Sequence, residues 1–321
     1  MTMPNPGSRW IAAALALGAS FIPGHACGAC GCTLNSDWAS QGYTAMAGFR
    51  VDLRQDYFNQ DQLRAGTGAP ARSGFPIPNS QELQQETLSR NTTLTLDYFT
   101  GNAWGLNLVV PYFNRFHTTI GGGDTEVSTS RREGLGDIRV TARYQGLTED
   151  PSFGVQAGFK LPTGSRDQTF SGGPQAGSPL DRGLQMGTGT TDLLFGVYKN
   201  GSLGEDWGYF SQAMGQVALK GRDGFRPGNA MNANAGVRYT GNPVVAPHVQ
   251  MNFRMEARET GENSDTPNSG ATLAYLSPGL TIQAGARVQF YGFVQVPVLQ
   301  RVNGLQVEPR SIFSAGVHCT F

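Results

Sequence analysis

The sequence predicts an all-β fold, a transmembrane antiparallel up-and-down β-barrel of about twelve strands over residues 45–321. Three observations predict it: apolar and polar residues alternate with period two along much of the chain, long connections alternate with short ones, and the last strand ends on Phe321. Composition agrees, because 15% charged residues are few for the surface of a soluble enzyme and 44 glycines are many for a helical protein. No segment after residue 26 approaches the roughly 18 apolar residues of a membrane helix, so the chain is expected to be either a large β-sandwich or a membrane barrel.

Residues 1–26 have the pattern of a secretory signal peptide. A polar start ends at Arg9, an apolar run too short to span a bilayer follows at 10–22, and Gly24-His25-Ala26 forms a small-residue exit. We therefore expect an exported protein of a bacterium, whose mature chain begins near Cys27 in a compartment that permits thiol oxidation. Removal of Arg9 changes 24 Lys+Arg to 23, against 24 Asp+Glu, so no basic excess indicates nucleic acid as a partner.

The alternation is clearest at 249–258, "VQMNFRMEAR", where the apolar side chains share one face and the polar and charged side chains share the other. The segments 231–239 and 137–144 repeat it. Runs of this kind predict strands at 46–57, 87–99, 103–116, 135–146, 152–160, 191–199, 206–220, 229–240, 247–259, 270–277, 281–297 and 311–321. A secreted β-sandwich would also alternate, but it would not be expected to combine alternation with unequal connections and a terminal Phe.

The connections between these runs alternate in length, as in outer-membrane barrels. Long links are predicted at 58–86, 117–134 and 161–190, with shorter ones on the same side at 221–228, 260–269 and 298–310. Tight turns are predicted at 100–103, 146–151, 200–206, 241–247 and 277–280. We expect the long links to be external, and the tight turns and both termini to be periplasmic. Trp104 and Trp207 each follow a tight turn, at the level of an aromatic girdle.

Three motifs resemble one family of outer-membrane proteins. They are "GLGDIRVTARYQ" at 134–145, "FKLPTG" at 159–164 and "GTGTTDLLFGVY" at 187–198. They are similar to the transporter-like barrels of the meta-pathway phenol-degradation family, with the best likeness over about 134–198. The resemblance implies passage of small compounds, aromatic ones among them, although a fold does not fix the cargo. Phe321 resembles the C-terminal signal that barrel-insertion machinery reads.

Alternation also predicts which charged side chains point into the barrel. The predicted pore-lining residues are Arg50, Arg54, Arg139, Arg143, Arg238, Arg254, Glu256, Arg258 and Arg287. Lys160, Asp52, Asp56, Asp97 and Asp137 are further inward candidates, so nine cations face five anions. In one interpretation these charges pair and fill the barrel. In the other, surplus guanidinium groups make a narrow channel that favours anionic or aromatic solutes. The link at 161–190 could fold inward and narrow the mouth.

An enzyme is not expected, and no catalytic residue is assigned. Beyond the signal peptide the histidines are His117, His248 and His318, and neither GxSxG nor HExxH occurs. A lone histidine in a barrel is more often a satisfied lumen residue than a general base.

The segment 27–44 is predicted to be periplasmic and contains a cysteine cluster, Cys27, Cys30 and Cys32. Three thiolates in a glycine-rich loop suit Cu(I) or Zn(II), although no cofactor is required for the barrel. A disulfide is equally compatible with an oxidising compartment, and lipidation of Cys27 is a third interpretation. Cys319 could pair with the cluster, but its predicted lipid-facing position argues against that bridge.

These observations predict an outer-membrane channel for passive passage of small solutes. Its expected partners are outer-membrane lipid, the insertion machinery and a small-molecule solute. The alternative is a metal- or redox-responsive envelope protein that uses the CxxCxC segment, with the barrel as its anchor.

Overall fold

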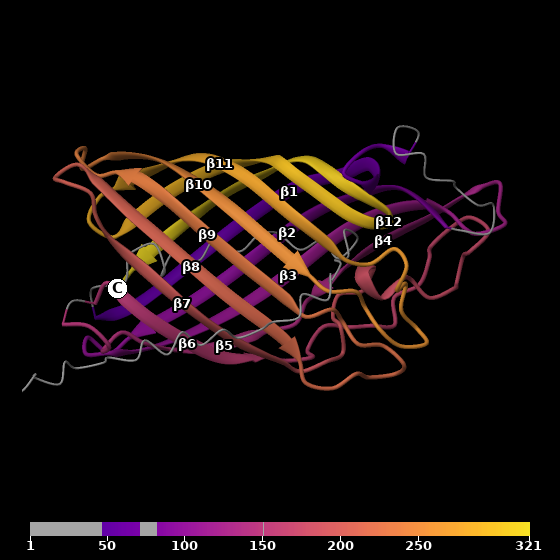
Figure 1. Ribbon diagram of the computed structural model, residues 1–321, viewed down its shortest axis with the longest axis horizontal. Coiled ribbons are helices and arrows are strands. Elements are labelled where there is room, and N and C mark those ends of the chain that lie inside the picture. Colours follow the sequence, from indigo (N-terminus) through magenta and orange to yellow (C-terminus); the bar gives the residue numbers. More distant parts are fainter. Residues whose placement is uncertain (1–46, 71–81, 150) are drawn as a thin grey trace, which may run out of the picture.

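The computed structural model describes residues 47–70, 82–149 and 151–321, which form a closed antiparallel β-barrel (Figure 1). The strands are β1 (Gly48–Gly66), β2 (Leu83–Phe99), β3 (Trp104–Ile120), β4 (Val127–Leu135), β5 (Arg139–Tyr144), β6 (Phe153–Lys160), β7 (Asp192–Ser202), β8 (Trp207–Ala218), β9 (Ala230–Tyr239), β10 (Val245–Glu256), β11 (Ala271–Ala284) and β12 (Val288–Thr320). Neighbouring strands pair around the ring, and the pairings of β1 with β12 and with β2 complete it. A 3-10 turn, η3, lies at Arg182–Leu184. Among the described residues no helix has the length and apolar character to cross a bilayer.

The expected number of about twelve strands is confirmed, with two differences in how the strands are built. β4 and β5 pair with successive parts of β3, so together they make one passage along it. β12 folds back at Val302, which pairs with Ala271 of β11 and with Gly66 of β1. The backbone N–H of Thr320 therefore reaches the carbonyl of Arg287, at 2.9 Å. Eleven strands make the closed ring, and β4 is the twelfth, beside β3.

The burial pattern of the strands is the reverse of that in a soluble protein. On β10, Val249 and Met251 are exposed, whereas Gln250, Asn252 and Arg254 are buried. The exposed face of the barrel carries large apolar side chains, as a surface in contact with lipid requires, and the inward face is mainly polar. The predicted alternation is thus confirmed in its direction as well as its period.

The two ends of the barrel differ. Connections of three to eight residues lie at one, the short-turn end, and the longer links 67–82, 161–191, 219–229 and 257–270 lie at the other, the long-loop end. The first and last strands meet at the short-turn end, where the N–H of Phe321 donates to the carbonyl of Phe49. Aromatic pairs also mark this end: Trp104 packs on Tyr144, with ring centroids 4.8 Å apart, and Trp207 packs on Tyr239 at 5.4 Å.

Several predicted connections are wrong. The link expected at 117–134 shrinks to 121–126, because β3 and β4 continue beyond the apolar band with polar residues on both faces, where alternation loses its contrast. The link at 58–86 is likewise shortened at both ends by β1 and β2. The turn expected at 277–280 lies at 285–287. The link expected at 298–310 is shorter than predicted, since β12 runs through it, but the reversal of β12 at Val302 falls inside this range.

The mistaken turn at 277–280 has a local cause, since Pro278-Gly279 has the composition of a turn. Within β11, Gly279 instead makes room for two neighbouring side chains, because an added Cβ would meet the ring of His248 and the Cβ of Phe293. The glycine is required by packing across the sheet and not by a turn. The predicted signal peptide and the cysteine segment 27–44 lie outside the described residues.

Candidate functional site

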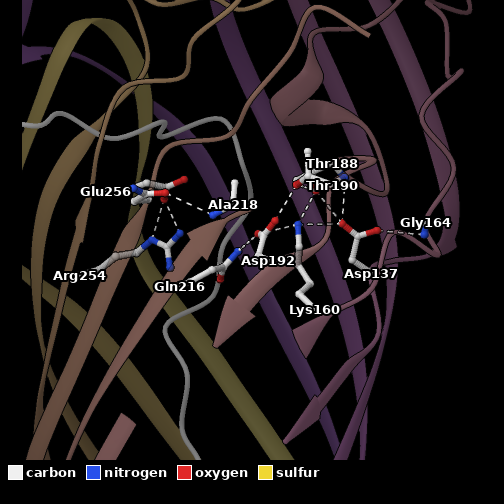
Figure 2. A network of polar contacts seen from close by, with 11 residues as sticks. Asp137, Lys160, Gly164, Thr188, Thr190, Asp192, Gln216, Ala218, Arg254 and Glu256 are labelled. Atoms are coloured by element: carbon white, nitrogen blue, oxygen red, sulfur yellow. Dashed lines mark hydrogen bonds and ion pairs between the residues drawn. The ribbon is translucent and has the colours of Figure 1, made fainter. Parts of the chain in front are cut away.

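Polar side chains of five neighbouring strands form a band inside the barrel near its long-loop end, which we call the polar belt (Figure 2). The polar belt consists of Lys160, Asp192, Gln216, Asn232, Arg254 and Glu256, together with Asp137, which precedes β5. Period-two alternation places these strand residues on the inward face. We call residues 161–191, which join β6 to β7 beside the polar belt, the mouth loop.

Lys160 is the centre of the polar belt. Its ammonium nitrogen lies 3.2 Å from Asp137 Oδ2 and 2.9 Å from Asp192 Oδ2, and it also donates to Thr188 Oγ1. The side chain is only 4% exposed, so these partners replace water around the ammonium group. Asp192 accepts two further hydrogen bonds, from Gln216 Nε2 at 2.6 Å and from the Thr190 hydroxyl. A buried ammonium ion is stable here because carboxylates and hydroxyls replace its hydration.

Asp137 links the two ends of the mouth loop through hydrogen bonds. Its Oδ1 accepts from the backbone N–H of Gly164, 3.1 Å away, at the start of the loop. Its Oδ2 accepts from the backbone N–H and the hydroxyl of Thr188, both at 2.9 Å, near the end of the loop. One carboxylate between β4 and β5 therefore closes the base of the mouth loop (Figure 2).

The mouth loop is also held against the inner wall. Arg115, buried on the inward face of β3, donates through one guanidinium nitrogen to the carbonyls of residues 183–185 at 3.2–3.3 Å. Arg132 of β4 donates to the carbonyl of Thr169, at 2.9 Å from Nε. Phe170, Leu180 and Leu184 are buried together within the loop. The loop thus has its own apolar core and lies against the inward faces of β3 and β4.

Four of the eight predicted pore-lining arginines are paired with carboxylates. Arg50 and Arg143 lie 3.4 and 3.2 Å from the two oxygens of Asp97. On β1, Arg54 Nε donates to Asp56 at 3.1 Å. On β10, Arg254 Nε donates to Glu256 at 3.0 Å, and its Nη1 donates to Asn232. These groups are buried and inward-facing, and their geometry favours the interpretation in which the charges neutralise one another.

Two predicted pore-lining positions do not lie on the strands. Arg258 is exposed in the connection after β10, which ends at Glu256, and Arg287 is exposed in the turn between β11 and β12. The expected strands at 247–259 and 281–297 included both residues, whereas β10 ends at Glu256 and β12 begins at Val288. Arg139 and Arg238 do lie on strands, where they are half-buried. The inward candidates Lys160, Asp52, Asp56, Asp97 and Asp137 are all buried.

The structure adds charged residues that the sequence interpretation missed. Arg115 and Asp192 both follow the alternation of their own strands, so the signal was present. The buried cations of the described residues are Arg50, Arg54, Arg115, Arg143, Lys160 and Arg254. The buried acids of the same residues are Asp52, Asp56, Asp97, Asp137, Asp192, Glu256, Glu259 and Glu308. Six fully buried cations thus stand against eight buried acids, and the half-buried, inward-facing Arg139 and Arg238 bring the cations to eight, so these residues do not show the predicted surplus of nine cations over five acids.

Histidines and cysteines contribute little to the site. His117 Nδ1 lies 2.8 Å from the Thr87 hydroxyl, and His248 stands edge-on to Phe293 at 6.4 Å. His318 lies 3.8 Å from Asp52. Within the described ranges, no three His, Cys, Asp or Glu side chains are placed to hold a metal ion. Cys319 is a free, half-buried thiol, and Cys27, Cys30 and Cys32 lie outside the described residues.

Comparisons with known proteins find a matching family and a similar barrel fold. The profile of a family described as "Putative MetA-pathway of phenol degradation" matches residues 64–296. An outer membrane channel from Pseudomonas putida F1 has a similar structure, with a TM-score of 0.65 and 13% identity over 89% of this chain and 100% of that one. A toluene transporter from Ralstonia pickettii gives a TM-score of 0.43 at 10% identity, over 86% of this chain and 90% of that one. None of the curated protein sequences matches.

Proposed function

Because the chain belongs to the family described as "Putative MetA-pathway of phenol degradation", we propose that it is an outer-membrane channel for passive passage of small, mainly neutral or weakly polar solutes, aromatic ones among them. One observation carries the proposal. The barrel is closed, with large apolar side chains on its outer face and polar side chains on its inner face, and such an outer face is suited to lipid and not to water. The resemblance to an outer membrane channel over the whole length of that protein supports the same fold. The family description supports aromatic solutes.

The arrangement of charges argues against selection of anions. A guanidinium group whose field is cancelled by a carboxylate about 3 Å away attracts an anion only weakly, since the pair acts as a dipole. Arg54 and Arg254 are each in this state, with Asp56 and Glu256, whereas Arg50 and Arg143 share the single carboxylate of Asp97. Of the two interpretations, paired charges or a channel that favours anionic or aromatic solutes, we favour the first and propose a channel that discriminates by size and polarity, at the narrowing made by the polar belt and the mouth loop.

The proposal includes an orientation and a set of partners. We place the short-turn end, with both ends of the barrel sheet, in the periplasm and the mouth loop outside the cell, as is usual for barrels of this class. The exposed apolar face would contact lipid, and Phe321 would be read by the insertion machinery. No group in the barrel is assigned to catalysis.

Planar-bilayer recording of the refolded protein tests the proposal. We expect discrete conductance steps with weak preference between K⁺ and Cl⁻, and proteoliposomes that admit phenol-sized neutral solutes. Arg254→Gln, which leaves Glu256 unpaired, should shift the reversal potential towards cations, whereas the exposed Arg258→Gln should leave it unchanged. Absence of conductance together with proteoliposomes impermeable to such solutes would overturn the channel.

The metal- or redox-responsive alternative depends on Cys27, Cys30 and Cys32. Nothing in the described part of the chain favours it over the channel. A thiol count and a copper titration of the mature protein would test it, and the absence of any stoichiometric metal or redox change would remove it.

A further inference from the structure

Carboxyl groups from separate connections converge at the tip of the mouth loop. Asp181 is half-buried just before η3, and Gln84 Nε2 of β2 donates to its Oδ2 at 3.3 Å. Glu82, which directly precedes β2, lies beside it, and its Oε1 is 3.9 Å from His117 Nε2. Asp265 of the link 257–270 adds a further negative charge that acts on both. The Asp181 carboxyl at the loop tip therefore lies close to other acidic side chains.

The part of the chain that the structure describes supplies no lysine or arginine partner to this carboxyl pair. Among the described residues no lysine or arginine forms an ion pair with Glu82 or Asp181. Arg115, on the neighbouring strand β3, uses its Nη1 on the carbonyls of residues 183–185. Arg182, adjacent in sequence, reaches away to the carbonyl of Asp223 and to the ring of Phe225.

Apart from the Glu86 carboxyl, further along β2, and the His117 imidazole on β3, the remaining neighbours are polar but uncharged, or apolar. Gln84 and Thr87 come from β2 and Thr119 from β3, and the mouth loop supplies Phe170, Leu180 and Leu184. His117 is fully buried and its Nδ1 is engaged by Thr87. In such surroundings two adjacent carboxyls cannot both be ionised without a large cost.

The titration behaviour follows from this geometry. Burial, and then the neighbouring Glu82 carboxyl, raise the pKa of Asp181 from 3.8 to about 8. Burial also raises the pKa of Glu82 above its ordinary value. A proton is therefore retained by the pair at neutral pH, and it belongs to the pair more than to either residue.

We propose that Glu82 and Asp181 form a proton-operated latch, in which a shared proton seats the tip of the mouth loop and loss of that proton releases it and widens the passage. This inference rests on the proposed channel function. The sign follows from linkage: a carboxyl whose pKa is raised in the seated state favours that state at low pH. The equilibrium constant for release rises up to about tenfold per pH unit until the pKa of the seated group is passed, so between pH 6 and 8 it should rise up to about a hundredfold.

Bilayer recording on the full chain tests the latch. Open probability should increase between pH 6 and 9 on the long-loop side of the wild type. Asp181→Asn should remain largely closed across this range, because an amide carries no charge to expel. Asp167→Asn, at an exposed position of the same loop, is the matched control and should keep the wild-type pH profile. A wild-type profile in Asp181→Asn, or its loss in Asp167→Asn, would overturn the latch.

A second measurement separates the latch from the channel. Spin labels at Ser178→Cys in the mouth loop and Arg90→Cys on the outer face of β2, with the native cysteines replaced by serine, report the position of the loop tip. The distance between them should increase from pH 6 to 9, and Asp181→Asn should abolish the change. If no variant conducts but the distance changes with pH, the channel fails and the latch stands. If the protein conducts and the distance does not change, the latch fails alone.

Discussion

Removal of the Lys160 ammonium group should destabilise the barrel more than removal of any exposed charge. In Lys160→Met the carboxylates of Asp137 and Asp192, which lay 3.2 and 2.9 Å from the ammonium nitrogen, lose their shared cation. Breaking a buried ion pair by removing one partner costs about 3–5 kcal/mol, because the other charge stays buried. Here two charges stay buried, which places the expected loss of unfolding free energy at the upper part of that range.

The magnitude is measurable by urea titration of the protein in phospholipid vesicles, followed by tryptophan fluorescence. Arg310→Met is the matched control: its Nε lies 3.2 Å from Asp61, but the side chain is 71% exposed, so the expected loss is about 0–1 kcal/mol. The double variant Lys160→Met/Asp192→Asn should recover part of the loss, since only one carboxylate then lacks a partner. If Lys160→Met is no more destabilising than Arg310→Met, the reasoning about the polar belt is refuted.

Three further predictions concern other parts of the barrel. Arg115→Met leaves the carbonyls of residues 183–185 without their donor, so proteolysis within the mouth loop of the folded protein should accelerate at least several-fold, whereas Arg131→Met at an exposed position of β4 should not change it. Gly154→Ala should cost about 1–3 kcal/mol in the same urea titration, because its Cβ would meet the Tyr198 ring, and Gly154→Ala/Tyr198→Leu should be less destabilised than expected from the two single changes. Replacing Trp104 and Trp207 by Phe should remove most of the fluorescence quenching by lipids brominated near the headgroup; unchanged quenching would contradict the aromatic girdle.

The sequence predicted the fold better than the strand limits, for a physical reason. Alternation depends on a contrast between lipid and lumen, and that contrast ends where the sheet leaves the bilayer. Thr118 of β3 and Ser128 of β4 pair with neighbours in the sheet but belong to stretches with polar residues on both faces, so they resembled a loop. At Pro278-Gly279 the error was the opposite one: a turn was predicted where the strand β11 continues, because residues typical of turns serve side-chain packing there.

The charged site was predicted in its members but not in its pairing. Alternation placed Lys160 and Asp137 correctly on the inside. Register across strands, which alternation does not specify, brings Asp192 of β7 to Lys160 of β6 as its direct neighbour. Asp181 had no periodic signal at all, since the path of a loop depends on tertiary contacts such as those of Arg115.

Charge pairing and loop position together bear on how such a barrel could discriminate between solutes. Arginines paired within the wall contribute a reduced field to the lumen, and the described strands carry six fully buried cations and six fully buried acids. Electrostatic selection then has little to act on in the wall, and we expect the mouth loop to discriminate between solutes. It is held at its base by Asp137, further along by Arg115, and at its tip by a carboxyl pair that needs a proton. We expect the tip to move when this pair loses its proton, while the base stays closed.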